Sequence, residues 1–377
     1  MAKVTSVRIS VMPSLILSTC GTSLLTNGGI PDDLRRLLNK HANSRDWSVM
    51  PADEAHTLQQ HANSRQQSLL AADEQQVRRL SAELNGLLSW QQRSETPVSP
   101  QDMYLLLATD TALGQATAQS VCAWLQKQGH SATIISATGL NTASLNSFRQ
   151  ALSGLVKDLH EQLSSYKASG YSINFNLTGG FKGLNGFLQA LSTIYADNAF
   201  YLFEGSSEVM LIPSLPLTLD AEQVIKQNLR AIRRLSQNLP VIAKDCSNIP
   251  ELLLFSIDQE RVLSEWGELL WRNSQSKLYK QGLYPSISER VIFGEAFEAS
   301  TRNKSPELLA IINQRIDDLA VYAEGDCKQA LKSLDPKQLQ GSQHRSLWEC
   351  DLDDHHRIFM RKDGHTFFLE KVDRALH

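Results

Sequence analysis

The chain has 377 residues, of which 42% are hydrophobic and 20% are charged, as in an ordinary folded protein. Its length suffices for about two or three domains. A formal net charge of -3 gives no general attraction to nucleic acid, so a polyanion site has to be local. No apolar run approaches the roughly 20 residues that cross a bilayer, and no signal peptide is expected at the N-terminus. The five scattered cysteines lack CxxC spacing, which favours a reducing cytoplasm over a zinc site or a disulfide framework.

The first predicted element is a buried strand at residues 14–18, followed by a small, hydroxyl-rich loop at residues 19–27. In α/β domains a loop of this kind follows the carboxyl end of a strand, where ligands bind. A loop that only closes the strand end is the alternative, and we favour ligand contact.

A polar insertion is expected at residues 30–97, because a twenty-residue unit is duplicated there. The pentapeptide His-Ala-Asn-Ser-Arg occurs at residues 41–45 and again at 61–65, and Ala-Asp-Glu occurs at 52–54 and at 72–74. Two copies are too few for a solenoid. We expect a largely helical segment that does not bind metal and that offers a docking surface for a partner such as a ribosomal protein.

Strands and helices alternate over the rest of the first 215 residues. Apolar residues at helical spacing predict a long helix over residues 145–163. The remaining predicted strands of this region lie at residues 104–108, 132–136, 171–175, 199–203 and 209–212. The alternation predicts an α/β fold with a doubly wound, Rossmann-like sheet.

The motif around which this domain is organised is Asn-Leu-Thr-Gly-Gly-Phe-Lys-Gly at residues 176–183, between a strand and a helix. Such a turn presents free backbone N–H groups and the positive end of the helix dipole, and Lys182 adds a full charge. The motif is neither a Walker A loop nor GxGxxG, and a turn built only for tightness is the alternative. A second loop, residues 109–114, also follows a strand, with Asp110 or Thr111 as a candidate helix cap.

A helical connector is expected over residues 218–283. It begins with a basic amphipathic helix at residues 219–237, interpreted as a solvated connector. Ser256 and Gln259 have the spacing of a capping box for a second, Trp-containing helix. This helix is expected at an interdomain or dimer surface.

The last unit, residues 284–377, is predicted to contain a strand, two helices and an antiparallel meander. One helix starts at Ser305, with Pro306 in its first position, and the second is expected near residues 327–333. Three short strands are expected at residues 346–352, 356–361 and 366–372. Basic side chains concentrate in this meander, although a solvated strand face is the alternative for each of them alone.

Residues 1–217 resemble the CRISPR-associated Rossmann-fold (CARF) sensors of type III CRISPR systems. The resemblance lies in residues 20–27, 108–111 and 176–182. It implies a homodimer that binds a cyclic oligoadenylate, most often cyclic tetra-adenylate, across its two-fold axis. The ligand contacts that it implies are Thr22, Ser23, Asn27, Thr109, Asp110, Thr178, Gly179, Gly180 and Lys182.

Some relatives also cut their own activator, which implies a slow ring nuclease activity here. That reaction is an in-line attack by a ribose 2'-hydroxyl, helped by groups such as Ser23 and Lys182 and needing no metal.

Residues 284–377 resemble RelE-type toxins, the ribosome-dependent mRNA endonucleases, through the element order, His356-Arg357-Ile358-Phe359 and the run at 369–374. The resemblance implies metal-independent RNA cleavage with no cofactor, in which cations bind the phosphate and an acid protonates the leaving oxygen. The residues assigned to it are Arg357 and Arg374 on the scissile phosphate, Arg345 and Lys371 on the backbone or in phosphate stabilisation, and His377 or His356 for proton transfer. That family often uses lysines and a late tyrosine instead, and this chain has no clear tyrosine near its end, which leaves the general acid open.

Together these features predict a cytoplasmic type III CRISPR effector, in which cyclic oligoadenylate activates a ribonuclease that cuts mRNA on the ribosome. One alternative is a stand-alone ring nuclease with a non-catalytic C-terminal domain. A ligand-responsive transcription regulator is disfavoured, because the C-terminal unit offers no helix-turn-helix.

Overall fold

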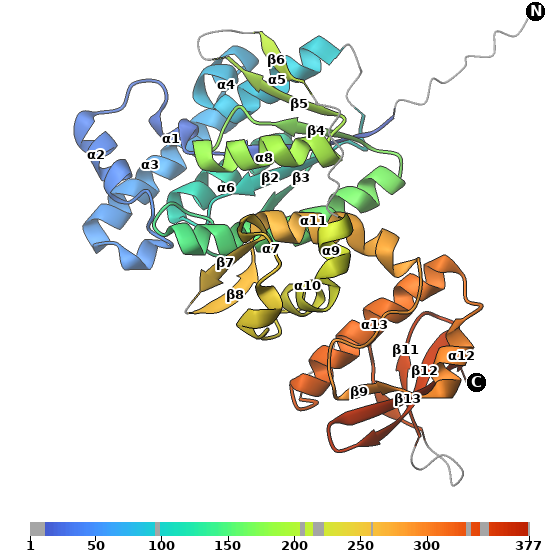
Figure 1. Ribbon diagram of the computed structural model, residues 1–377. Helices are drawn as coiled ribbons and strands as arrows, with labels where there is room; N and C mark the ends of the chain where they lie inside the picture. The colour runs from blue at the N-terminus through green and yellow to red at the C-terminus, as the bar shows by residue number, and fades with distance from the viewer. Residues whose placement is uncertain are drawn as a thin grey trace, which may run out of the picture. The chain divides into compact units, whose positions relative to one another are not determined.

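The structure is a computed structural model that describes residues 12–94, 99–203, 208–213, 222–257, 259–328, 333–339 and 347–375. The chain divides into two compact units, residues 1–218 and 219–377 (Figure 1). The expected connector therefore belongs to the same compact unit as the C-terminal meander. Within the described residues, no helix is both long and apolar enough to span a membrane.

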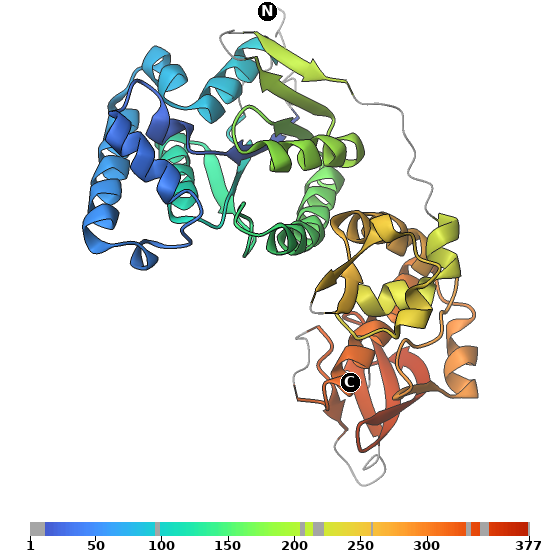
Figure 2. The ribbon, with the colours of Figure 1, turned by 60° about the vertical axis from the view of Figure 1, so that its left-hand side comes forward.

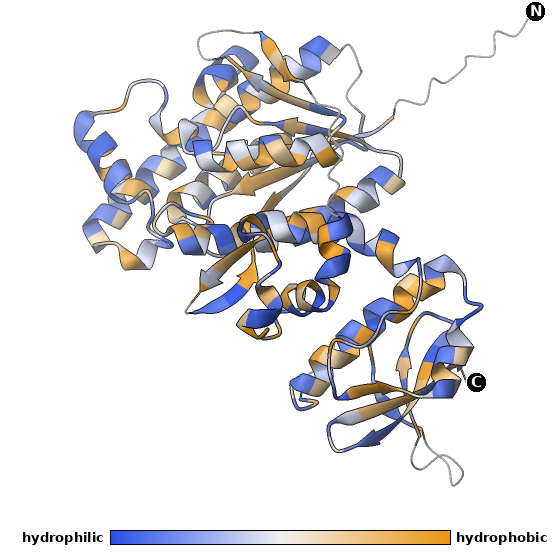
Figure 3. Ribbon diagram, viewed as in Figure 1, coloured by the Kyte–Doolittle hydropathy of each residue, from blue (hydrophilic) through white to orange (hydrophobic). Residues whose placement is uncertain are grey.

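In the described part of the first unit, six strands form a sheet in the order β3-β2-β1-β4-β5-β6. All neighbours pair in parallel except β5 and β6, which are antiparallel. The strands are β1 Ser14–Cys20, β2 Met103–Ala108, β3 Ser131–Ile135, β4 Ser172–Asn176, β5 Asn198–Leu202 and β6 Val209–Ile212. The predicted doubly wound α/β sheet is confirmed, and its strands are among the most hydrophobic segments in Figure 3.

Helices cover both faces of this sheet, as right-handed crossovers require. Helices α5 (Ala82–Ser94) and α6 (Ala112–Lys127) pack on the face to which β1 and β2 contribute Ile16 and Tyr104. Helices α7 (Leu145–Ala168) and α8 (Lys182–Tyr195) follow β3 and β4 and contact the sheet at β4 and β5. The two faces are buried because the strands are apolar on both sides.

The predicted insertion is helical, as expected, but its last helix is part of the core. It contains α2 (Asp32–Lys40), α3 (Ala52–Ala71) and α4 (Glu74–Leu80) ahead of α5, and the short helix α1 (Ser23–Thr26) precedes it. Leu84 and Leu87 of α5 are buried in the sheet core, where each stabilises the fold by roughly 1.5–3 kcal/mol, and Trp90 stacks on Phe200 at 4.5 Å. The segment that departs from the α/β pattern therefore ends before α5, not at residue 97. Figure 2 shows α2 and α3 beside α1.

The second unit begins with a helical part whose charged side chains are partly buried. The predicted helix at 219–237 is divided into α9 (Glu222–Gln227) and α10 (Leu229–Ser236). Arg233 is only 2% exposed and pairs with Asp317 at 2.5 Å. The interpretation of this segment as a solvated connector is therefore wrong. Sequence periodicity cannot identify Arg233 as a buried residue, because its carboxylate partner Asp317 is 84 residues away in the sequence.

The expected capping box at Ser256 and Gln259 is wrong. Instead, β7 (Leu254–Ile257) and β8 (Glu260–Leu263) pair as an antiparallel hairpin, and Gln259, just before β8, has a φ of 71°. Helix α11 (Glu265–Tyr279) begins after this hairpin, and its cap is the Ser264 hydroxyl, which accepts from the Gly267 amide at 3.1 Å.

A five-stranded sheet in the order β10-β11-β12-β13-β9 completes the described part of this unit. Two helices of the described residues lie between the first two of its strands in the chain. They are α12 (Glu295–Thr301), which the sequence analysis did not predict, and α13 (Pro306–Glu324). The strands are β9 Val291–Phe293, β10 Lys337–Gln338, β11 Leu347–Asp351, β12 His356–Asp363 and β13 Thr366–Arg374. A strand, two helices and an antiparallel meander follow one another here, but the two helices are α12 and α13, and α13 contributes Ile312 and Ile316 to the core. Of the second helix expected near residues 327–333, residues 327, 328 and 333 are not helical, and residues 329–332 lie outside the described residues.

Candidate functional site

Three loops of the first unit meet at one edge of its sheet. They follow β2, β1 and β4, which are adjacent in the order β2-β1-β4, so the carboxyl ends of these parallel strands lie side by side. The strand order reverses between β1 and β4, which is the place where open α/β sheets bind ligands. Residues 19–27, 109–114 and 176–182 are thus brought together.

The loop after β1 is held by a buried carboxylate that the sequence analysis missed. Glu83, which is 0% exposed, accepts from the Gly21 amide and from the hydroxyls of Ser23 and Ser81, each at 2.8 Å. Ser23 in turn accepts from the Ala82 amide at 3.1 Å. The predicted contact Ser23 therefore joins its loop to the start of α5. The available sequence signal was Ser81, whose hydroxyl accepts from the Leu84 amide at 3.2 Å and marks a helix start.

The glycines of the motif at 176–183 are required by close packing. A Cβ on Gly179 would lie 2.3 Å from Oε1 of Glu83, and one on Gly21 would lie 2.9 Å from the Gly180 nitrogen. Gly180 also has a φ of 83°, a conformation that favours glycine. The Gly179 carbonyl accepts from Thr19 Oγ1 at 2.7 Å. The loops after β1 and β4 thus form one packed surface with the Glu83 carboxylate beneath it.

Thr178 is engaged within the protein. Its hydroxyl donates to Oδ1 of Asn176 at 2.7 Å and accepts from the Leu202 amide at 3.1 Å. Asn176, fully buried, also donates to Ser18 and to the Glu83 carbonyl. These bonds fasten the loop after β4 to β1, β5 and α5, so in this structure Thr178 shapes the loop.

Two of the predicted contacts are exposed on this edge. Lys182 is the first residue of α8, whose N-cap Phe181 makes no side-chain capping bond, and Thr22 precedes α1. At the N-terminus of a helix of 14 residues, the unpaired N–H groups and the macrodipole favour an anion, and the Lys182 ammonium strengthens this preference.

The loop after β2 carries Thr109, Asp110 and the actual N-cap of α6, Thr111, which accepts from the Gly114 amide at 3.1 Å. Thr109 shares a hydrogen bond with Thr111 at 3.0 Å. Asp110 accepts from the Gly139 amide at 2.8 Å, and its carboxylate lies 3.8 Å from Nε of the exposed Arg45. Arg45 was not among the predicted residues, although it belongs to the duplicated pentapeptide.

Asn27 closes the loop after β1. Its side-chain amide lies 3.4 Å from the carbonyls of Arg79 and Leu80, and its own carbonyl accepts from Arg65. Cys20, at the end of β1, does not offer a thiolate, because burial and then the nearby Glu83 raise its pKa well above the ordinary value. Among the described residues no cluster of three or more His, Cys, Asp or Glu side chains is arranged to hold a metal ion.

The predicted catalytic cations of the second unit lie on two faces of the meander. His356 and Arg374 pair across β12 and β13, as do Ile358 and Val372 of the core, so they share the core-facing side. Arg357 and Lys371 project to the other side, because successive strand residues alternate. Lys371 lies over the Phe359 ring there. The structure therefore does not bring the four described cations together. Arg345 and His377 lie outside the described residues.

Most of these cations have carboxylate partners. Arg357 is 9% exposed, pairs with Asp351 at 2.8 Å and donates to the carbonyl of Asp353 at 2.6 Å. Nδ1 of His356 lies 3.0 Å from both carboxylate oxygens of Asp353. Lys371 pairs with Asp373 at 2.8 Å, and this hydrogen bond is the main cause of a lowered Asp373 pKa. The positive charge that the sequence concentrates here is therefore offset locally.

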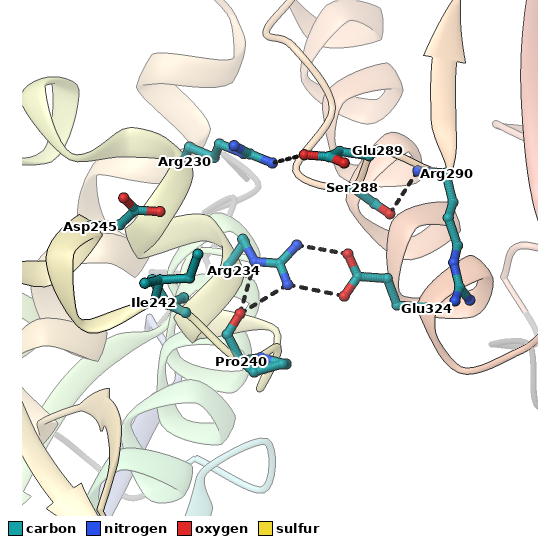
Figure 4. A pocket seen from close by; sticks show the side chains of 10 residues that line it. Arg230, Arg234, Pro240, Ile242, Asp245, Ser288, Glu289, Arg290 and Glu324 are labelled. Atoms are coloured by element: carbon teal, nitrogen blue, oxygen red, sulfur yellow. Dashed lines mark hydrogen bonds and ion pairs between the residues drawn. The ribbon is translucent and has the colours of Figure 1, made fainter.

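A cavity of about 420 Å³ in the second unit is also lined by charged residues (Figure 4). Arg234 spans it, binding both oxygens of Glu324 at 2.7 and 3.0 Å and also the Pro240 carbonyl. Arg230 lies 3.8 Å from Glu289 across it. Its three arginines are balanced by three carboxylates, so the lining does not select an anion.

Comparison with known proteins finds one family model that matches part of the first unit. Residues 78–215 match the family described as CRISPR-associated protein (Cas_APE2256). The matched segment includes Glu83 and the loops after β2 and β4, and it supports the resemblance of the first unit to CRISPR-associated sensors. It ends before the second unit begins.

No curated protein matches the chain. A solved structure, Enterococcus italicus Csm6 bound to cyclic hexa-2'-fluoro-hexa-dAMP, matches at a TM-score of 0.30 and 12% identity. The match covers 83% of this chain and 62% of that chain, so this chain spans less than two thirds of its length. A TM-score of this size does not establish a shared fold.

Proposed function

We propose that the first unit binds a cyclic oligoadenylate, with cyclic tetra-adenylate as the leading candidate, at the carboxyl edge of its sheet. The observation that carries the proposal is the convergence of the three loops after β2, β1 and β4 at the switch point of the strand order. The match of residues 78–215 to a CRISPR-associated family is the reason for choosing this class of ligand.

The ring would lie on the exposed side of this edge. Lys182 and the N-terminus of α8 offer positive charge to its phosphates, and Thr22 and Thr109 offer hydroxyl groups. Glu83 and Thr178 then act beneath the surface by fixing the loops. A ring with two-fold symmetry suits two copies of this edge, so we propose a homodimer that binds one ring between its protomers.

The test is equilibrium binding of labelled cyclic tetra-adenylate to the wild type and to Lys182→Gln. Because the side chain of Lys182 is exposed, this change should weaken binding without lowering the free energy of unfolding. Lys167→Gln is the control, since it also removes one exposed lysine from the first unit but in the last turn of α7, which precedes β4 rather than following it. Equal affinities for the ring in both variants would contradict the assignment of Lys182.

We further propose that the second unit is the effector, a metal-independent ribonuclease that cuts mRNA on the ribosome when the ring is bound. The support is the order of strand, two helices and meander, together with His356 and Arg374 facing each other across β12 and β13. The Asp353 carboxylate orients His356 through Nδ1, which leaves Nε2 for a proton to the leaving oxygen. Arg374 would bind the scissile phosphate.

Arg357 and Lys371 serve this proposal less directly, because they lie on the opposite side of the sheet and Arg357 is held by Asp351. The informative variants are therefore His356→Ala and Arg374→Ala. Ring-dependent cleavage of mRNA on translating ribosomes should disappear in both, while ring binding remains. If cleavage persists in both, or if the wild type only degrades the ring, the chain is a ring nuclease with a non-catalytic second unit.

A further inference from the structure

The duplicated pentapeptide His-Ala-Asn-Ser-Arg takes two different conformations in the first unit. Its first copy, residues 41–45, is a turn that follows α2, whereas its second copy, residues 61–65, lies in the middle of α3. Identical sequences therefore present the same side chains on different backbones. Their contacts reach two different loops of the proposed ring site.

The second copy holds the loop after β1. Nε2 of His61 lies 2.8 Å from the Leu25 carbonyl, and Nε of Arg65 donates to the Leu24 carbonyl at 2.7 Å. Arg65 also donates to the carbonyl of Asn27. These carbonyls end the four-residue helix α1, where backbone acceptors have no partner within the helix and a cation is favoured by the helix dipole.

The first copy holds the loop after β2. The Ser44 carbonyl accepts from the Ala112 amide at 2.9 Å, at the first residue of α6. Oδ1 of Asn43 accepts from the amide and hydroxyl of Thr142 at 3.1 and 2.8 Å, next to the Gly139 turn that Asp110 binds. Arg45 lies 3.8 Å from Asp110 itself.

The turn of the first copy is itself fixed by a buried imidazole. His41 lies with Nδ1 3.1 Å from Ser44 Oγ and Nε2 2.5 Å from Glu54 Oε2, and Glu54 also pairs with Lys40 at 2.6 Å. Hydrogen bonds from Lys40 first and then from His41 lower the pKa of Glu54. The carboxylate is thus ionised at neutral pH and keeps the imidazole in place.

We propose that the two copies are positioning elements with separate targets, the second fixing the loop after β1 and the first fixing the loop after β2. Ring affinity then depends on Arg65 and His61, whose hydrogen-bonding groups are directed at backbone carbonyls of α1 and its cap. This inference rests on the proposed function, because it concerns the same ligand edge. It assigns the duplicated segment a role within its own unit.

The test is hydrogen–deuterium exchange of the full chain without ligand, on peptides that report residues 20–29, 108–116 and 139–145. Arg65→Gln should raise exchange of the Leu25 and Asn27 amides, which bond to Thr22 and Ser23 at 2.9 and 2.8 Å. Arg45→Gln, the same change in the other copy, should leave this peptide as in the wild type. Arg65→Lys should behave like Arg65→Gln, because an ammonium does not reproduce the planar fork of the guanidinium.

For the first copy, Asn43→Ala should raise exchange at Thr142, whose amide it binds, and Asn63→Ala at the matching position on α3 should not. Labelled cyclic tetra-adenylate then reports on function. Arg65→Gln should weaken its binding about tenfold, the effect expected from losing hydrogen bonds of ordinary strength.

Unchanged exchange at 20–29 in Arg65→Gln overturns the inference, and so does a rise that is equal across the whole chain. Local loosening with wild-type ring affinity also overturns it, because the loop would then not matter to the ligand. A wild-type chain that ignores the ring contradicts the proposed function instead, and the exchange data then decide the loop-holding role by themselves.

Discussion

The hydroxyl of Ser23 donates to the carboxylate of Glu83 at 2.8 Å across 60 residues of sequence. Glu83 also accepts from the Gly21 amide and packs against Gly179, so one buried carboxylate organises the loops after β1 and β4. The loops of the proposed ligand edge are thus preorganised by a residue that is fully buried.

Replacing Glu83 by Gln should destabilise the first unit. The change removes charge-assisted hydrogen bonds and turns an NH₂ group toward donors, leaving buried polar groups unsatisfied, which costs about 1.5–3 kcal/mol. Urea unfolding of the full chain measures the loss. Glu74→Gln is the control: Glu74 is exposed and pairs with Arg78 at 2.7 Å on the surface, so its loss should cost less than about 0.5 kcal/mol. Equal unfolding free energies in the two variants would show that Glu83 does not hold the loops.

Gly179→Ala should destabilise the chain and abolish ring binding together. The added Cβ would lie 2.3 Å from Oε1 and 2.6 Å from Cγ of Glu83, a clash that moves the loop or the carboxylate. Gly186→Ala, in the same segment, meets nothing within 4 Å and should stabilise α8 by up to about 1 kcal/mol. Thermal unfolding and ring binding of both variants check this. Wild-type ring affinity in Gly179→Ala would contradict the proposed site.

The sheet and the three ligand loops could be predicted because their signals are local. Each predicted strand from residue 104 to residue 212 lies within one or two residues of an observed strand, since a short apolar run bounded by turn residues specifies it. The Gly-Gly turn was found for the same reason. The sequence could not show that Gly179 packs against Glu83, because this side chain lies 96 residues earlier in the chain.

The rest depends on contacts distant in sequence. The sequence predicts a solvated helix around Arg233, because its buried partner Asp317 is distant in the chain. It predicts a helix start at Ser256, because the pairing of β7 with β8 has no local signal. The meander was predicted, but alternation along β12 puts His356 and Arg357 on opposite sides, which separates cations that are neighbours in sequence. The duplicated pentapeptide marks the limit most clearly, because one sequence forms both a turn and a helix.

Arg233→Met should strongly destabilise the second unit. Arg233 and Asp317 are both buried, and Arg233 also donates to Tyr279 at 3.0 Å and to the Pro285 carbonyl at 2.7 Å. Removing one partner leaves an uncompensated buried charge, at a cost of about 3–5 kcal/mol. Arg230→Met, on the exposed side of α10, should cost less than about 1 kcal/mol. Denaturant unfolding distinguishes them, and a small loss in Arg233→Met would refute the role of this pair.

The stability of the second unit should depend on Glu222 in acid. Hydrogen bonds from Lys226 and then Lys277 lower the pKa of Glu222 to about 2. Because this pKa is below that of the unfolded chain, about 4.3, the contribution is complete above that pH and is lost as the pH falls toward 2. Glu222→Gln should therefore flatten the pH dependence of the urea midpoint in this window, and Lys226→Gln should flatten it in part. An unchanged slope in Glu222→Gln would contradict the assignment.

The most direct test of the central claim is isothermal titration calorimetry of the full chain with cyclic tetra-adenylate, with linear tetra-adenylate as the matched ligand. The account predicts saturable binding of the ring at one ring per two chains, weaker binding of the linear form, and loss of ring binding in Gly179→Ala. Absence of ring binding by the wild type, or equal affinity for the ring and the linear form, would contradict it.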